Sequence, residues 1–447
     1  MQVNRFVLSC AAAIVATVTT ALPASAASVA KFAAAQAINW HGQVINVELV
    51  MPFYKRTFGK GIWTTNNGLS KRGAELVDVL SKAGADGLDT RDYLGGLKGD
   101  VNAMRGDDLA AAELYLSEAA IRFSRDLFAG RTTPSISEPD IVIARKQLDT
   151  VALLDSFDKN GVEKVMARLR PAHEQYTRLR QLLAKTSNEA QHRKIVVNME
   201  RWRWLPRDLG ERHVLVNAAA FLMYTYDKGR MIDRRRVIVG QEYHRTPMFS
   251  SAISYAEFNP TWTVSRNIAG NEILPKLRKN PNYLSSIGYE VHTSWEEDSP
   301  MMNPASIDWS TVPAKNFPYR IVQPAGPENV LGVVKFLFPN KFNVYLHDTS
   351  SRQLFDKADR ALSHGCIRIE NPLEFADLLY GFDRSLAPGD IRGLVASKKT
   401  VQAKFRKPVP VHLGYFTLWV GDDGRVSNFD DIYGRDKLIE RIVFGGA

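Results

Sequence analysis

The chain has 447 residues, of which 45% are hydrophobic and 24% charged; this excludes an intrinsically disordered protein and leaves room for two or three domains. Its 58 lysines and arginines against 48 aspartates and glutamates give a net charge of +10, typical of a protein with an acidic partner such as nucleic acid, anionic lipid or an anionic polymer.

The first 26 residues have the pattern of a secretory signal peptide. Arg5 is followed by a run of small and apolar residues, and Ala24-Ser25-Ala26 fits the small-x-small rule for cleavage after Ala26. A retained membrane anchor is the alternative, but the run is short and rich in alanine and threonine rather than leucine. Export argues against a nucleic-acid partner, and cleavage would remove Cys10.

Residues 27–206 are predicted to form an α-helical scaffold domain. The stretch GLSKRGAELVDVLSKAG places apolar residues at helical spacing and offers Gly84 as a stop. The same pattern recurs in DDLAAAELYLSEAAIRFSRDLFAG, which ends at Gly130. The last helix, HRKIVVNMERWRWLP, is predicted to stop at Pro206.

After Pro206 the pattern becomes that of β-strands. HVLVNAAAFLMYTY and RRRVIVG flank Asp227-Lys228-Gly229, which predicts a hairpin, and a second hairpin is predicted around Asp423-Gly424. Further strands are predicted at VLGVVKFLFP and FNVYLHD. The expected fold is therefore α+β, with a mostly β domain over 207–397 and a C-terminal β extension over 398–447.

Residues 259–328 interrupt these strands. The segment begins with turn-rich sequence, contains a short predicted helix at Glu272–Leu284, and is loop-like and dotted with proline over 286–328. A connection of this length is more often functional than a simple link between strands.

Cys366 would be the single cysteine of the mature chain, so it marks either an intermolecular disulfide or a reactive thiol. His364 lies two residues before it, and His347 ends the predicted strand FNVYLHD. A nucleophilic cysteine needs an imidazole or a positive charge nearby, because an ordinary thiol is mostly protonated at neutral pH. Gly365 lets backbone N–H groups face an oxyanion, and Arg368 would share a face with Cys366 and could bind a carboxylate.

Three other interpretations of Cys366 are weaker. A buried apolar cysteine would need a better core environment than Ser-His-Gly. A zinc site formed with His347 and His364 would require an awkward His-x-Cys chelate, and no clear fourth ligand presents itself. An intermolecular disulfide is weaker still. The sequence therefore predicts no metal and no cofactor.

YLHDT followed by SHGCIR resembles the signature of the L,D-transpeptidases, whose catalytic domain is often called YkuD. That signature is a histidine, a gap of some fifteen residues, Ser/Thr-His-Gly-Cys, and usually Asn or Arg two residues on. His347, the run 363–366 and Arg368 match it. The similarity extends over nearly the whole mature chain, through segments that resemble the large periplasmic subfamily of Gram-negative bacteria: FYKRTFGKGIWTTNNGLSKRGAELVDVL, RLRPAHEQYTRLR, NMERWRWLP, EFNPTWTVS and DDIYGRD.

One departure from that subfamily concerns wall binding. Its members commonly carry a peptidoglycan-binding module between the RLRPAHEQY and RWRWLP helices, whereas only about twenty residues, QLLAKTSNEAQHRKIVVNME, join them here. The module is therefore expected to be absent. Substrate docking would then fall to the catalytic domain, the lid or the helical domain.

The resemblance implies that Cys366 attacks the carbonyl at the L-centre of meso-diaminopimelate in a peptidoglycan tetrapeptide stem. The terminal D-alanine leaves, and the thioester passes to an amine. His347 would be the general base, with the carbonyl oxygen of Asp348 orienting its ring. His364 would have a supporting role, and the N–H groups of Gly365 and Cys366 would face the oxyanion.

The resemblance further implies that 259–328 is a lid over the cleft, with Asn259 and Trp262 in its wall and Ser363 among the substrate contacts. Packing in a core is an equal alternative for Trp262. The expected location is the periplasm. The expected partners are peptidoglycan stem peptides, with diaminopimelate, a D-amino acid, water or an outer-membrane protein as acyl acceptor.

Two rival functions remain. A papain-like or cell-wall hydrolase also uses cysteine and histidine, but there the cysteine precedes the histidine, and His412 is the single histidine after Cys366. A non-enzymatic wall-binding scaffold is the other; it would not need the full Cys366 and His347 arrangement.

Overall fold

The computed structural model describes residues 29–133, 138–387 and 389–445, so the predicted signal peptide lies outside the described residues. No helix among the described residues is long and apolar enough to cross a membrane. The chain divides into two compact units. Of the described residues, the first contains 29–84, Asp89–Ser124 and Leu148–Ala167, and the second contains Ala85–Leu88, those within 125–147 and those from 168 onward.

The first unit is helical, as predicted. The Glu113 carboxylate is completely buried and accepts the N–H groups of Ile62 and Thr64, both at 2.7 Å, and the hydroxyl of Tyr54 at 2.6 Å. These bonds compensate the burial of a charge and fix a loop against the longest helix. The elements are β1 (Ala37–Trp40), β2 (Gln43–Asn46), α2 (Val47–Arg56), β3 (Thr64–Thr65), β4 (Gly68–Leu69), α3 (Lys71–Ser81), α4 (Arg91–Leu94), α5 (Gly106–Ala129), α7 (Thr150–Asn160) and α8 (Val162–Leu169).

The helix stops predicted at Gly130 and Pro206 are confirmed, whereas α3 ends at Ser81, before the stop predicted at Gly84. Ser70 caps α3 by accepting the N–H of Gly73, and α5 ends before Gly130, whose φ of +87° is in the left-handed region. The helix α10 (Glu189–Trp204) ends just before Pro206. It follows α9 (Glu174–Leu183) after a short loop over 184–188, so no module separates the two helices.

The predicted boundary at 206 needs correction, because α9 and α10 belong to the second compact unit. The apolar side chains of α10, including Met199 and Trp202, share a core with Leu215 and Tyr224 of the sheet. The apolar face of α10 is thus buried against the strands that follow it in sequence.

A nine-stranded sheet forms the centre of the second unit, in the order β15-β7-β16-β14-β13-β8-β17-β5-β6, and a further pairing of β7 with β6 gives it a barrel-like closure. The predicted hairpin at Lys228-Gly229 is confirmed: both residues have positive φ, as a two-residue turn between right-twisted strands requires. The strands are β5 (Arg212–Asn217), β6 (Leu222–Asp227), β7 (Arg230–Gly240), β8 (Phe249–Phe258), β13 (Val334–Leu337), β14 (Leu346–His347), β15 (Ala361–Ser363), β16 (Ile367–Ile369) and β17 (Val401–Gly414).

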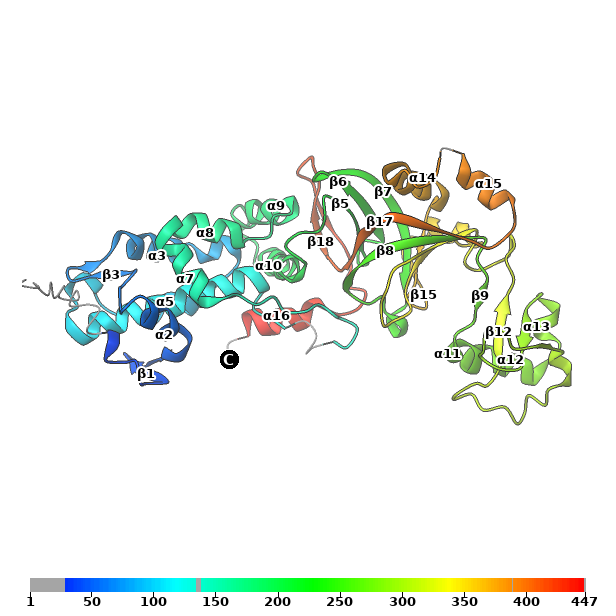
Figure 1. The fold of residues 1–447 in the computed structure, drawn as a ribbon, viewed down its shortest axis with the longest axis horizontal. Coiled ribbons are helices and arrows are strands. Elements are labelled where there is room, and N and C mark those ends of the chain that lie inside the picture. The colour runs from blue at the N-terminus through cyan, green and yellow to red at the C-terminus, as the bar shows by residue number, and fades with distance from the viewer. Residues whose placement is uncertain (1–28, 134–137, 388, 446–447) are drawn as a thin grey trace, which may run out of the picture. The chain divides into compact units, whose positions relative to one another are not determined.

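The predicted boundary at 397 also needs correction. The strand β17 lies beside β8 in Figure 1 and pairs with both β8 and β5, so it is an interior strand of the main sheet rather than an extension. The second predicted hairpin is confirmed by β18 (Leu418–Val420) and β19 (Val426–Asn428). The remaining helices are α14 (Pro372–Asp383), α15 (Asp390–Ala396) and α16 (Asp436–Phe444).

The segment predicted to be a loop-like lid has its own sheet, of order β11-β10-β12-β9, and its own core, which includes Leu277, Trp309 and Phe317. Figure 1 shows its helices gathered beside β9 and β12. The predicted helix is divided at Asn280, since the residue before Pro281 disfavours helical geometry. The elements are β9 (Trp262–Thr263), α11 (Arg266–Ile268), a π-helical turn (Ala269–Ile273), α12 (Leu274–Lys279), α13 (Tyr283–Ser286), β10 (Glu290–His292), β11 (Met301–Met302) and β12 (Arg320–Gln323).

Candidate active site

Two short parallel strands bring the predicted nucleophile and base together. In β14 and β16, Leu346 lies opposite Ile367 and His347 opposite Arg368. Cys366 directly precedes β16, at the end of the turn that leaves β15. The crossover between the two strands accounts for the gap between His347 and Cys366 in the sequence, because parallel strands need a long connection.

Cys366 and His347 line one cleft of about 440 Å³. His364, Ser363 and Arg368 line the same cleft, and Trp262 contributes to it from the lid. The structure therefore gathers six of the predicted residues around one cavity.

The His347 ring is held by the main chain. Its Nδ1 lies 2.5 Å from the carbonyl oxygen of Asp348, so Nδ1 carries the proton that it donates and Nε2 keeps a free lone pair. Burial lowers the pKa of His347 to about 3, and the positive charge of Arg368 contributes in the same direction. The imidazole is therefore neutral at physiological pH and able to accept a proton.

The Cys366 thiol is half-buried, and its Sγ lies 3.7 Å from the carbonyl oxygen of Asn343. Burial raises the pKa of this thiol to about 11, although hydrogen bonding from Tyr345 and the charge of Arg368 act in the opposite direction. In the resting protein the pair is therefore a neutral thiol and a neutral imidazole rather than a thiolate–imidazolium ion pair.

The turn before Cys366 is held by Ser363. Its hydroxyl accepts the N–H of Gly365 at 3.1 Å and donates to the carbonyl oxygen of Cys366 at 2.6 Å. Two predicted roles change as a result: Ser363 shapes the turn, and the N–H of Gly365 is already engaged. The N–H of Cys366 bonds to no other residue in the described part of the chain, so it is the better donor to an oxyanion.

Glycine at 365 is required by conformation rather than by space. Its φ is +111°, which side chains rarely adopt, whereas an added Cβ would meet its nearest neighbours at an ordinary 3.6 Å.

Arg368 is half-buried, and its position two residues beyond Cys366 in extended backbone puts both side chains on one face. Its Nε is buried and has no hydrogen-bond partner among the described residues. A buried donor without a partner in a cleft is suited to a carboxylate ligand.

Asn259 does not lie in the cleft wall, contrary to the prediction. Its side-chain amide donates to the carbonyl oxygens of Leu394, Val395 and Lys399 at 2.9–3.2 Å, which fixes the end of α15. Trp262 does line the cleft, and its ring also packs edge-on to Tyr289 of the lid core. Trp262 therefore both lines the cleft and packs against the lid core, the two roles considered for it.

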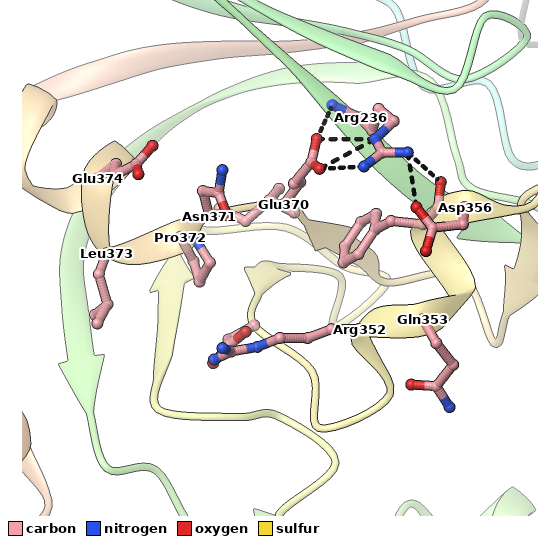
Figure 2. Close-up of a pocket in the computed structure, with 12 residues that line it drawn as sticks. Arg236, Arg352, Gln353, Asp356, Glu370, Asn371, Pro372, Leu373 and Glu374 are labelled. Carbon is pink, nitrogen blue, oxygen red and sulfur yellow. Dashed lines mark hydrogen bonds and ion pairs between the residues drawn. The ribbon is translucent and has the colours of Figure 1, made fainter.

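Asp348 lines a second cavity, of about 450 Å³. Figure 2 shows this cavity with Arg236, Asp356 and Glu370, which also line it. One carboxylate oxygen of Asp348 accepts the N–H of Val333 at 2.9 Å. Across this cavity Arg236 pairs with Glu370 at 2.5 Å and with Asp356 at 3.2 Å. The lining does not include Cys366, so Asp348 reaches the active site through its carbonyl group and not through its side chain.

Sequence reasoning missed Tyr345, His244 and Glu272. Burial, followed by the proximity of Cys366, raises the pKa of Tyr345, so this hydroxyl stays protonated and able to donate toward the sulfur. Its position two residues before His347 in the predicted strand FNVYLHD was an available signal, because alternate residues of a strand share a face. His244 and Glu272 come from distant segments, and no sequence spacing points to them.

His412 lies outside this cleft. Its two ring nitrogens are 2.8 Å from the Ser250 hydroxyl and 2.9 Å from the Leu209 carbonyl oxygen. Both nitrogens are therefore used in hydrogen bonds to neighbouring segments. The papain-like order of cysteine before histidine therefore has no histidine to support it among the described residues.

Residues 211–410 match the family model of the L,D-transpeptidase catalytic domain, YkuD, and residues 48–183 match that of a scaffold domain. This chain carries a YkuD L,D-transpeptidase domain. In chain order, the matched range includes every strand of the main sheet from β5 to β16 and most of β17, and with them Cys366 and His347.

The chain is also similar to a protein of Haemophilus influenzae described as a "Putative L,D-transpeptidase", to which it is 36% identical over 256 residues. That match covers 57% of this chain and 50% of the relative, so the chain spans about half the length of the relative.

Two solved structures show weaker similarity to the chain. "Structure of the Ldtfm-avibactam carbamoyl enzyme" is 12% identical over 46% of this chain and 49% of that one, with a TM-score of 0.22. "L,D-transpeptidase from Mycobacterium smegmatis" is 11% identical over 45% and 58% of the two chains, with a TM-score of 0.21. Scores this low do not establish a shared fold.

Proposed function

We propose that this protein is a cysteine L,D-transpeptidase that acts on peptidoglycan tetrapeptide stems in the periplasm. The carrying observation is that two paired strands bring Cys366, directly before β16, and a neutral His347, oriented by the main chain at the end of β14, to one cleft. The buried, unpartnered Nε of Arg368 supports a donor that bears a carboxylate, as the stem peptide does.

In the first half-reaction, the Cys366 sulfur attacks the carbonyl carbon at the L-centre of meso-diaminopimelate while Nε2 of His347 takes the thiol proton. The resulting oxyanion faces the N–H of Cys366. As the intermediate collapses, the C–N bond to D-alanine breaks and the protonated His347 gives its proton to the leaving amine. The products are a thioester on Cys366 and free D-alanine.

In the second half-reaction, an acceptor amine attacks the thioester and loses a proton to His347, and the departing sulfur recovers that proton. A second stem peptide as acceptor gives a 3→3 cross-link, and a D-amino acid gives stem exchange. An amine of an outer-membrane protein would give anchoring. Water as acceptor gives the alternative activity, an L,D-carboxypeptidase.

Mass spectrometry of muropeptides tests the proposal. Wild-type protein incubated with disaccharide-tetrapeptide should release D-alanine and form a cross-linked dimer, and a carbapenem should add once to Cys366. Cys366→Ala should do neither while keeping its circular dichroism spectrum. Equal product from Cys366→Ala would contradict the cysteine mechanism, and tripeptide as the sole product would favour the carboxypeptidase.

A further inference from the structure

Three side chains that commonly bind metals meet at the edge of the cleft. They are His244 at the end of a short 3-10 helix, Glu272 in the lid and His364 in the signature turn. One ligand atom from each lies within 4.8 Å of the other two. Nε2 of His364 is 2.7 Å from Oε1 of Glu272, and the two imidazole centroids are 4.9 Å apart.

We propose that His244, Glu272 and His364 form a binding site for a divalent transition-metal ion, with zinc as the best fit, that ties the lid to the catalytic turn. Two imidazole nitrogens and one carboxylate oxygen are a zinc ligand set that leaves a fourth position for water. Tetrahedral bonds of about 2.0–2.1 Å place neighbouring ligand atoms roughly 3.3 Å apart, so small side-chain rotations suffice to close this set around an ion.

The two histidines are held together by the main chain, independently of the lid. The N–H of Gln241 donates to the carbonyl oxygen of Ser363 at 2.9 Å. The Thr246 hydroxyl donates to the carbonyl oxygen of Gly365 at 2.9 Å. These bonds join the loop that carries His244 to the turn that carries His364, so two of the three ligands are pre-organised.

The third ligand lies on an unusual piece of backbone. Glu272 belongs to the π-helical turn Ala269–Ile273, between α11 and α12. Such turns are rare and occur frequently at functional sites, because the extra residue changes the direction of the side chains around it. Here the turn directs a lid carboxylate to the catalytic loop.

All three side chains are at least partly exposed, so an ion from solution can reach them. Because Glu272 belongs to the lid while the histidines belong to the catalytic loops, a bound ion would hold the lid against those loops. Metal binding would thereby slow the entry of donor peptide to Cys366. The competing explanation is a plain hydrogen-bonded pair of His364 and Glu272 that binds no ion.

Cobalt titration of the full chain separates these explanations. The protein carries Cys366→Ser so that the thiol cannot be the ligand, and visible absorption reports Co²⁺ in a nitrogen and oxygen site. We expect binding of one ion, displaced by Zn²⁺, and at least tenfold weaker binding when Glu272→Gln or His244→Gln is added. Glu242→Gln is the matched control, because this exposed carboxylate lies on the same short helix as His244 and outside the cluster.

Hydrogen exchange of the lid gives the second measurement. Zinc should slow exchange over 262–323 in the Cys366→Ser protein and leave the Glu272→Gln variant unchanged. Absence of one-to-one binding below about 100 µM, a weak affinity for a dedicated site, would overturn the proposal. Equal binding by all variants would overturn it too. Neither measurement uses transpeptidation, so failure of the metal-site proposal is distinguishable from failure of the proposed function.

Discussion

At the scale of single residues, the Cys366–His347 pair is uncharged at rest because burial shifts the two pKa values apart, to about 11 and about 3. The acylation rate with a carbapenem should therefore be nearly constant between about pH 5 and pH 9. A pre-formed ion pair would instead give a rate that changes with the ionisation of its members in this range. A rate that rises with a midpoint near pH 6.5 would contradict the neutral pair.

The two histidines of the site should respond differently to substitution. His347→Ala removes the proton acceptor and should slow acylation by about 10²–10⁴, the range typical of a lost general base. The loss should shrink as the pH approaches the thiol pKa of about 11, where hydroxide supplies the thiolate. His364→Ala should cost less, since its ring nitrogen is paired with Glu272. A larger loss for His364→Ala would reverse the assignment.

At the scale of elements, the turn between β15 and β16 depends on the Ser363 hydroxyl for two hydrogen bonds. Ser363→Ala leaves both backbone partners unpaired, which should cost about 1–3 kcal/mol. The Ser363→Ala substitution should also slow acylation more than tenfold, because the Cys366 N–H is no longer held toward the oxyanion. Ser363→Thr keeps a hydroxyl and is the matched control. Equal acylation rates for the two variants would show that the hydroxyl does not position the turn.

How far the sequence predicts each element depends on how local its cause is. The Lys228-Gly229 turn and the end of α5 before Gly130 arise from a few adjacent residues, and the sequence predicts both. The sequence predicts a loop-like lid because the lid core joins Leu277, Trp309 and Phe317 across short strands with no clear alternation of polar and apolar residues. Asn259 was misplaced because its partners in 394–399 are distant in sequence.

At the scale of the whole molecule, the second unit buries several histidines in the neutral form. Burial lowers the pKa of His347 and His173 to about 3, that of His412 to about 4, and also that of His213. An unfolded histidine has a pKa near 6.5, so between these values the unfolded chain binds protons that the folded chain does not. The contribution of these neutral histidines to the stability of the folded protein is fully present above about pH 6.5 and is lost as the pH falls.

Urea unfolding at pH 7.5 and pH 5.0 measures this effect. His347 and His412 should each contribute a loss of about 2 kcal/mol at pH 5.0, roughly 1.5 pH units below the unfolded pKa. His412→Gln should reduce the difference between the two pH values by about that amount. His41→Gln, which changes an exposed histidine, should leave the difference in unfolding free energy between the two pH values as in the wild type. Equal stability at the two pH values would contradict the prediction.

The hydrogen bond from His347 to the carbonyl oxygen of Asp348 has a consequence for how the protein can evolve. Every amino acid supplies a carbonyl oxygen, so no point mutation at 348 can delete the atom that orients the base. The side chain at the same position is buried and accepts the N–H of Val333, so it is constrained by the local structure rather than by the orientation of the base. One residue thus meets two constraints through separate atoms: its main chain orients His347, and its side chain holds the loop at Val333.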